Sequence, residues 1–298
     1  MAKRSRRQLS EHEREERRRV DRERMQRAAE QLLSSDGWQR WVRVRSRNGL
    51  SRYSINNQLL IALVRPDASY VAGFHAWVEL GYQVGKGEKA IWILAPMTVK
   101  QRQADGDEKD ERRVFFRAVP VFDRAQVAEI EGRTAAVLEP PCEPLTGDSH
   151  EHLLEPLSAF ATGIGFSVSF QSIAGSTGGW CDRSAGRIVV DASQPVNAQV
   201  RILVHELAHA MGVDYERYGR RRAEVIVDTV SFIVCAGAGL NAGGETIPYV
   251  AGWGEDGGLE AVSECAAIID SLARRVEEVI RQATDPNDVP LDAALAVG

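Results

Sequence analysis

The stretch VHELAHAMG, residues 204–212, decides how the second half of this chain folds and which chemistry it can carry. His205 and His209 are four residues apart, so they share one face of an α-helix, with Glu206 beside the first. The surrounding residues are apolar, and no helix breaker precedes Gly212. Two imidazoles and a carboxylate are costly to bury without a compensating partner. The stretch therefore predicts two ligands of a tetrahedral metal and a carboxylate that activates water, with two ordinary core histidines as the alternative.

A catalytic site of this kind needs a third protein ligand and an open fourth position. Glu224 opens an apolar helix fifteen residues after His209, and Asp228 follows one turn later on the same face. We expect Glu224 to be the ligand, and Asp228 either to replace it or to orient a ligand histidine. Asp214 and Glu216 are closer in sequence but fall in a polar loop, where carboxylates are usually solvated.

The expected chemistry is hydrolysis of a peptide bond. Zn²⁺, favoured by the ligand types, lowers the pKa of a bound water and polarises a carbonyl group. Glu206 then accepts the proton of the water and delivers it to the leaving nitrogen. Tyr249 either steadies the oxyanion or packs beside Trp253. The strand GRIVVD, residues 186–191, is expected to receive an extended peptide by strand addition.

Composition excludes several other classes of protein. The chain has 298 residues, of which 44% are hydrophobic and 27% charged, as is typical of a globular protein with a proper core. No apolar run is long enough to span a membrane, and the N-terminus has no apolar segment typical of a secretory signal. The four cysteines form no CxxC pair. We therefore expect a cytoplasmic protein without a membrane partner, a disulfide framework or a cysteine-based zinc knuckle.

The pattern along the chain predicts an α+β protein of two domains. A charged arm, residues 1–33, is followed by a first domain at 34–128, a proline-bearing linker at 129–156 and a second domain at 157–298. Within the arm, residues 10–33 are typical of a solvated helix, and contact of its arginines with nucleic acid is the alternative.

The first domain is expected to contain two helices and two paired strands. The helices are predicted at 52–64 and 71–84, and the antiparallel strands at 90–99 and 114–122, joined by a charged connection. In the linker, His150 and His152 have a spacing that suits a metal, but histidines in a polar linker are more often solvated.

The second domain is expected to begin with two strands, at 166–172 and 186–193, separated by a glycine-rich turn. The helix with the two histidines and a helix at 221–237 follow. A last amphipathic helix has apolar residues at a spacing of three to four, which marks a core face: Leu259, Val262, Ile269, Leu272, Val276 and Ile280.

Two runs of sequence resemble known families. HELAHA, followed by the helix that opens with Glu224, resembles the ImmA/IrrE-type zinc metallopeptidases. The run SINNQLLIALVRPDASYVAGFHAWVELGYQVGKGEKAIWILAP, continued by FRAVPVFDRAQV, resembles the N-terminal single-stranded-DNA-binding domain of ArdC-type antirestriction proteins. Those proteins also join this domain to a metallopeptidase domain. The two resemblances cover roughly residues 30–255 in the expected order.

The resemblance implies that His205 and His209 are metal ligands, Glu224 is the third ligand and Glu206 the catalytic base. It also implies single-stranded DNA as a partner of the first domain. Single strands are held by cations along the backbone and by aromatic rings that stack on bases. The residues expected around the DNA-binding unit are Asn56, Asn57, Trp77, Lys86, Lys89 and Arg117.

Three hypotheses follow. The leading one is an antirestriction-like protein whose single-stranded-DNA-binding module localises a zinc-dependent peptidase acting on an unidentified protein or peptide. The second is a non-catalytic DNA-protecting protein with a structural metal site. The third is an ImmA/IrrE-like regulatory peptidase that cleaves a transcriptional repressor.

Overall fold

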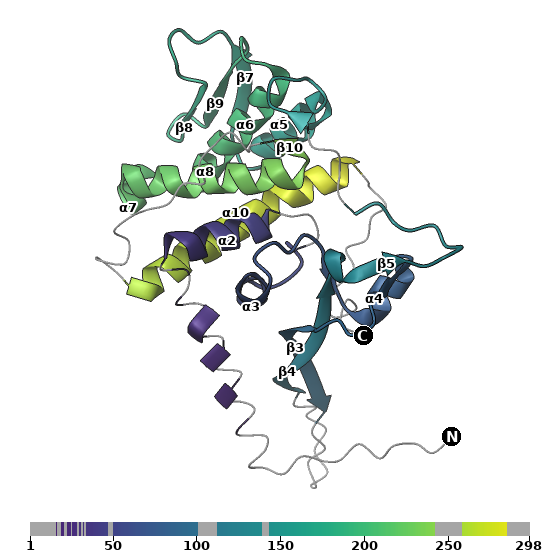
Figure 1. Ribbon diagram of the computed structural model, residues 1–298. Coiled ribbons are helices and arrows are strands. Elements are labelled where there is room, and N and C mark those ends of the chain that lie inside the picture. Colours follow the sequence, from purple (N-terminus) through teal and green to yellow (C-terminus); the bar gives the residue numbers. More distant parts are fainter. Residues whose placement is uncertain are drawn as a thin grey trace, which may run out of the picture.

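The computed structural model of the chain describes, besides scattered positions between 16 and 32, residues 34–46, 50–100, 112–138, 143–241 and 258–284. The chain mixes helix and sheet, as the sequence predicts. In Figure 1 the small sheet of the second half lies at one end and the long β3–β4 hairpin at the other, with helices α2, α8 and α10 between them. Among the described residues, no helix combines the length and apolarity that a bilayer span requires.

The first half is organised around the β3–β4 hairpin. Strands β3 (Ile91–Lys100) and β4 (Arg112–Asp123) pair antiparallel from Ile91 opposite Val121 to Lys100 opposite Arg112, as predicted. Short strand β1 (Val71–Ala72) pairs with the other side of β4, which leaves β3 at an edge. The remaining elements are α2 (Ser35–Arg45), α3 (Ile55–Val64), α4 (Phe74–Glu79), β2 (Tyr82–Val84), a short 3-10 turn η1 (Arg124–Gln126) and β5 (Val127–Glu129).

The prediction of one helix over residues 71–84 is wrong at both ends. Only Phe74–Glu79 is helical, and Tyr82–Val84 forms β2, which pairs antiparallel with β5. Gly81 ends the helical turn with a φ of +88°, and a Cβ there would lie 2.8 Å from the backbone oxygen of Thr134. A glycine in this left-handed region closes a helix without steric cost, so the chain reverses into a strand.

The second half places a three-stranded sheet beside helix α6. Strand β9 (Arg187–Asp191) is central, with β7 (Ser167–Gln171) parallel to it and β8 (Gly179–Asp182) antiparallel to it. Strand β8 lies in the segment predicted to be a glycine-rich turn. The predicted strand addition onto β9 is wrong, because both edges of β9 are already paired. The free edge next to α6 belongs to β8.

The other elements of the second half are helical except for two short strands. They are β6 (Glu143–Pro144), a 3-10 turn η2 (Glu151–Leu153), α5 (Leu154–Gly163), α6 (Val196–Ala210), α7 (Tyr215–Tyr218), α8 (Arg220–Gly237), β10 (Leu240–Asn241) and α10 (Gly258–Thr284). Strands β6 and β10 pair parallel. In α10 the predicted core face is buried at Val262, Ile269, Leu272 and Val276.

Segments expected to be solvated take part in the packing. Ala28 and Leu32 of the charged arm belong to the main hydrophobic core, although the described positions 16–30 are otherwise largely exposed. In the predicted linker, Ala135 and Leu138 pack against the cluster around Trp77. His150 is buried: its Nε2 lies 2.8 Å from the carbonyl oxygen of Ala238, so it fastens the linker to the end of α8.

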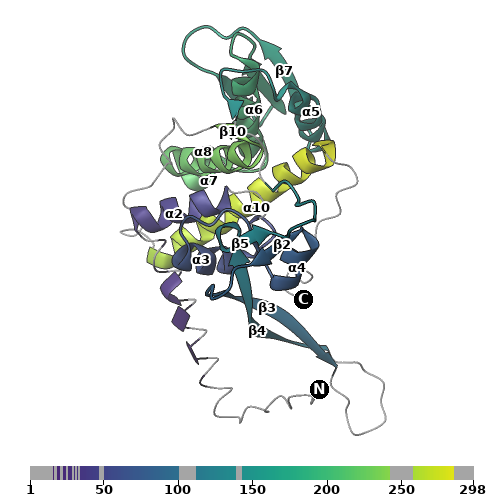
Figure 2. The same cartoon turned by 45° about the vertical axis from the view of Figure 1, so that its right-hand side comes forward.

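Helix α10 joins the two halves. Trp38 and Trp41 of α2 and Leu59 and Leu60 of α3 share one hydrophobic core with α5, α6, α8 and α10. Figure 1 and Figure 2 show α10 running below α8, with α2 alongside it and α3 on the side away from α8. The apolar residues of the two halves therefore form one continuous core, which is not typical of two units joined by a hinge.

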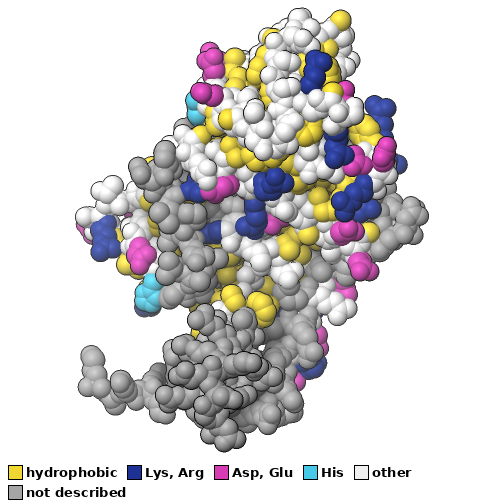
Figure 3. Space-filling model, turned by 180° about the vertical axis from the view of Figure 1, so that it is seen from behind, with side chains coloured by type: hydrophobic (Ala, Val, Ile, Leu, Met, Phe, Trp, Pro, Cys, Tyr) yellow, Lys and Arg dark blue, Asp and Glu magenta, His cyan; other side chains and the backbone are white. Residues whose placement is uncertain are grey.

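One face of the molecule carries side chains of both charges. On the face seen in Figure 3, Lys and Arg side chains lie interspersed with Asp and Glu over the middle of the molecule. This face therefore does not present a patch of one charge that would steer a charged partner towards it.

Candidate metal centre

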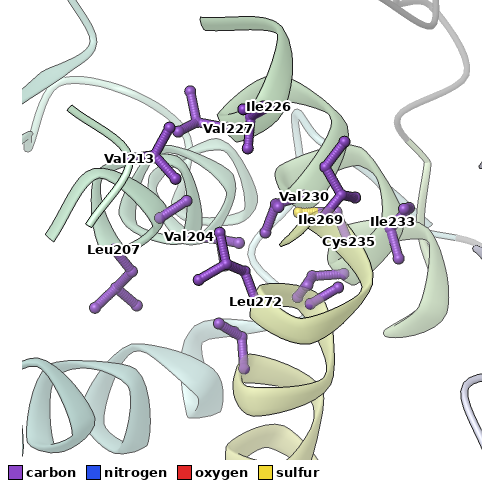
Figure 4. Packing of buried hydrophobic residues seen from close by; sticks show 14 of the residues in the cluster. Val204, Leu207, Val213, Ile226, Val227, Val230, Ile233, Cys235, Ile269 and Leu272 are labelled. Atoms are coloured by element: carbon purple, nitrogen blue, oxygen red, sulfur yellow. The ribbon is translucent and has the colours of Figure 1, made fainter. Parts of the chain in front are cut away.

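Helices α6 and α8 bring three potential metal ligands together. His205 and His209 lie on α6 and Glu224 near the start of α8, and one donor atom from each lies within 4.8 Å of the others. The helices are held in this register by apolar side chains beneath the site, including Val204, Leu207, Ile226, Val227 and Val230, which Figure 4 shows against Ile269 and Leu272 of α10. The predicted ligand set is thus brought together, and its occupation by a metal stays a prediction.

The two imidazoles are oriented by acceptors on their outer nitrogen atoms. The Nδ1 atom of His205 lies 3.1 Å from Oδ1 of Asp228, and Nδ1 of His209 lies 2.7 Å from the carbonyl oxygen of Val213. An acceptor at Nδ1 places the ring proton there and leaves the Nε2 lone pair available to a metal. Both Nε2 atoms face Glu224, at 3.6 Å from Oε2 for His205 and 3.9 Å from Oε1 for His209.

Asp228 accordingly lies where it orients His205, and it is not in the donor group. This geometry favours the orienting role among the two alternatives that the sequence leaves open. A carboxylate behind a ligand imidazole also raises its basicity.

Glu206 is buried beside the histidines, only 6% exposed. Its Cγ faces Gly179 of β8, where a Cβ would lie 3.4 Å away. Burial raises the pKa of the Glu206 carboxyl to about 7, against the opposing effect of His205. A carboxyl with a pKa near neutrality, close to the histidines but outside the donor group, suits a general base.

The electrostatics of the site favour a cation. Burial opposes protonation of His205, but Asp228, Glu206 and Glu224 raise its pKa above the usual value. Burial lowers the pKa of His209. Three carboxylates therefore surround two imidazoles in a partly buried site, a surplus of negative charge that a divalent ion would compensate. The donor set and the acceptors behind it fit such an ion.

Sequence reasoning missed Tyr215, in the segment treated as a polar loop. The Tyr215 hydroxyl donates a hydrogen bond to Oε1 of Glu224, and its ring lies edge-on to His209 at 5.5 Å between centroids. Burial, and then Glu224, raise the pKa of Tyr215 to about 12, so the phenol is protonated at neutral pH. The signal in the sequence is weak: a tyrosine in the short connection between two ligand-bearing helices.

Asp214, in the same segment, does not lie in the donor group and is not a solvated loop carboxylate. It caps α7 by accepting from the backbone nitrogen of Arg217 at 2.7 Å, and it pairs with Arg183 at 2.6 Å. Glu216 is exposed, as expected. Tyr249 lies outside the described residues.

The residues expected around the DNA-binding unit separate into buried and exposed sets. Trp77 is fully buried and donates from Nε1 to the carbonyl oxygen of Phe122, so of the two roles open to an aromatic ring here, core and stacking surface, it has the core role. Asn57 is also buried, and its amide bonds both the nitrogen and the oxygen of Leu94. These two side chains hold α4 and α3 to the hairpin. Asn56, Lys86, Lys89 and Arg117 are exposed.

Two further aromatic side chains are exposed on the hairpin. Trp92 is 49% and Phe116 67% exposed. Trp92 lies opposite Pro120 and Phe116 opposite Pro96, which places both rings on the same face of the two-stranded ribbon. Ile91 and Ile93 are buried on the other face.

The first half of the chain matches a known family. Residues 10–122 match the family model of the N-terminal domain of anti-restriction factor ArdC. The matched residues include helices α2 to α4 and the β3–β4 hairpin up to Phe122.

Proteins that are similar over most of this chain share little sequence identity with it. An uncharacterized protein of Bacillus anthracis is 22% identical over 279 residues, which are 78% of this chain, and the chain spans about half (47%) of that relative. Two crystal structures of the antirestriction protein ArdC from plasmid R388 are similar to this chain. The metal-free one has a TM-score of 0.44 and 16% identity, covering 82% of this chain and 86% of that one. The Mn(II)-bound one has a TM-score of 0.49 and 18% identity, and the match covers 89% of this chain and 99% of that one.

Proposed function

We propose that the chain is an antirestriction protein that joins a metal-dependent peptidase site to a surface for single-stranded DNA. The observation that carries the peptidase half is the arrangement of His205, His209 and Glu224, with both imidazole Nδ1 atoms held by acceptors. The match to the N-terminal domain of anti-restriction factor ArdC supports the antirestriction role.

The three ligands would hold a divalent ion, with zinc preferred from the ligand types. Such an ion would supply Lewis acidity for a carbonyl oxygen and lower the pKa of water. Glu206 accepts a proton from water at its carboxylate and passes it to the leaving amide nitrogen. Because Glu206 lies against Gly179, the free edge of β8 is the place where an extended peptide pairs beside the base.

The peptidase half is tested with metal analysis and one matched pair of variants. Purified wild-type chain is expected to bind about one zinc ion, and His209→Ala and Glu224→Ala to lose it. Glu206→Gln is expected to keep the metal and lose hydrolysis of unfolded casein, because only the proton carrier is removed. Glu216→Gln, an exposed carboxylate on α7, is the control. Hydrolysis that survives Glu206→Gln at wild-type rate would contradict the proposed base.

The proposed surface for single-stranded DNA is the exposed face of the β3–β4 hairpin. Trp92 and Phe116 present their rings to solvent on one face, and Lys86 and Lys89 supply exposed cations just before β3. Arg117 follows Phe116 in β4 and therefore points to the opposite face of the ribbon. Residues 92 and 96 are four positions apart along β3, so the two rings lie roughly 13 Å apart along the ribbon. Sequence-independent binding of a single strand needs this combination of stacking surfaces and cations.

Fluorescence anisotropy with a labelled oligothymidylate tests this surface. Phe116→Ala is expected to weaken binding by about 1–3 kcal/mol, the usual contribution of one stacked base. Phe170→Ala, a similarly exposed ring on β7, is the control. Lys89→Ala should reduce the salt-dependence slope by about 0.7, because Lys89 is exposed just before β3. Equal affinities of the Phe116 and Phe170 variants would exclude the hairpin as the stacking surface.

A further inference from the structure

In each candidate ligand, a neighbouring group holds one atom of the side chain by a hydrogen bond. Asp228 holds Nδ1 of His205, and the Val213 carbonyl oxygen holds Nδ1 of His209. For Glu224, the restraining group is the Tyr215 hydroxyl, which donates to Oε1. The other carboxylate oxygen of Glu224, Oε2, lies 3.6 Å from Nε2 of His205.

Tyr215 is itself fixed from several sides. Its ring lies edge-on to His209, with an interplanar angle of 77°. The guanidinium of Arg220 lies 5.9 Å from the ring centroid. The residue opens α7, whose first turn is capped by Asp214, and Asp214 in turn pairs with Arg183 in the turn after β8. The ring is thus placed by contacts with α6 and α8, and the cap of its helix is tied to the β8–β9 turn, although almost half of Tyr215 is exposed.

A glutamate ligand without such a partner is free to rotate its carboxylate away from the histidines. The side chain of Glu224 is 35% exposed, so packing alone does not fix its carboxylate. Among the described residues, the Tyr215 hydroxyl is the hydrogen-bond donor that the structure assigns to this carboxylate. Groups that orient metal ligands in this way typically change metal affinity by about 10- to 100-fold when removed.

We propose that Tyr215 is a positioning residue of the metal centre, which holds Glu224 by its hydroxyl and aligns the carboxylate with His205 and His209. The inference rests on the proposed metal site and adds a fourth side chain on which its affinity depends. It also connects the turn between β8 and β9 to the metal centre, because the Arg183–Asp214 pair fixes the helix that carries Tyr215.

The test compares Tyr215→Phe with Tyr218→Phe in the full chain. Tyr215→Phe keeps the ring against His209 and removes only the hydroxyl. Tyr218 is on the same short helix, packs against the main core and does not bond Glu224, so it is a matched control. Dissociation constants for Zn²⁺ and Co²⁺ are measured by competition with a chelating dye, and unfolding of the metal-free proteins is followed by circular dichroism.

We expect Tyr215→Phe to weaken binding of both metals about tenfold or more, and Tyr218→Phe to leave it within twofold. The visible spectrum of bound Co²⁺ should change in Tyr215→Phe only, because the carboxylate is no longer held. Unfolding of the metal-free variants should match the wild type. A structural effect would instead lower metal-free stability and spare the Co²⁺ spectrum, and that result overturns the inference.

The outcomes also separate this inference from the proposed function. Wild-type metal binding with equal affinity in Tyr215→Phe overturns the positioning role and leaves the metal site standing. Failure of the wild-type chain to bind either metal overturns the metal site itself and the positioning role with it.

Discussion

A buried arginine fastens the first half of the chain to the last helix, and its removal should weaken the whole fold. Arg45 is fully buried; its Nε lies 2.5 Å from Oδ1 of Asp270, and its two terminal nitrogens lie 2.7 and 2.8 Å from the oxygens of Glu277. Asp270 also accepts from Gln58 at 3.0 Å and Arg274 at 2.9 Å. Burial disfavours the charged guanidinium, but the two carboxylates outweigh this and raise the pKa of Arg45 above its usual value.

The expected loss follows from which charges are left unpaired. Removing one partner of a buried pair typically costs about 3–5 kcal/mol, because the remaining charge stays desolvated. After Arg45→Met, Asp270 keeps Arg274 and Gln58, and the Glu277 side chain is 21% exposed, so its charge is partly solvated. We therefore expect the lower end, about 3 kcal/mol. At ~2 °C per kcal/mol for a large domain, the melting temperature should fall by about 6 °C.

The assay is urea unfolding of metal-free protein, followed by tryptophan fluorescence and circular dichroism. Arg43→Met is the control, since Arg43 lies on the same helix but is exposed, and its change should stay within about 0.5 kcal/mol. Combining Arg45→Met with Glu277→Gln should restore part of the loss, because Glu277 then carries no charge and Asp270 keeps its pair with Arg274. A loss below about 1 kcal/mol for Arg45→Met would refute the reasoning.

Three other predictions concern packing and pH. Gly179→Val should destabilise by about 1–3 kcal/mol in urea unfolding, because a Cβ would lie 2.6 Å from Cγ2 of Ile202, whereas Gly163→Ala meets no atom within 4 Å and should be neutral. Trp77→Ala should cost about 3–5 kcal/mol by the same measurement, and comparable losses from Trp77→Ala and the exposed Phe116→Ala would contradict the packing described. Hydrogen bonds from Ser193 and then Gln194 lower the pKa of Asp191 to about 2, below its unfolded value of 3.8. Their stabilisation is therefore present above pH 4 and disappears as the pH falls towards 2, so the stability difference from Asp191→Asn should shrink across that window in urea titrations, and a constant difference would count against it.

Local patterns predicted much of the candidate site. The histidine spacing, the apolar residues around it and a carboxylate opening the next helix are all properties of single helices. They placed His205, His209 and Glu224 in the arrangement that the structure shows. The β3–β4 pair was also predictable, because alternation of buried and exposed residues is a property of one strand and its neighbour.

Contacts between segments distant in sequence were not predictable in this way. A tryptophan such as Trp77 can either pack in a core or stack on a base, and its sequence neighbours do not decide between the two. Its contacts with the Tyr70 and Tyr82 rings place it in the core. Strand β9 looked available until β7 and β8 were seen on its two sides. Glycines at 178 and 179 suggested a turn, whereas they let β8 approach α6 closely.

The sequence by itself thus determined the helix that carries the two histidines, the position of the candidate third ligand and the hairpin of the first half, because those features depend on residues a few positions apart. Tertiary structure alone decided that Tyr215 contacts Glu224, that Asp228 lies behind His205 and that Arg45 meets α10. The physical reason is that each of these contacts depends on how two helices pack. That packing is set by the shared apolar core rather than by either helix alone.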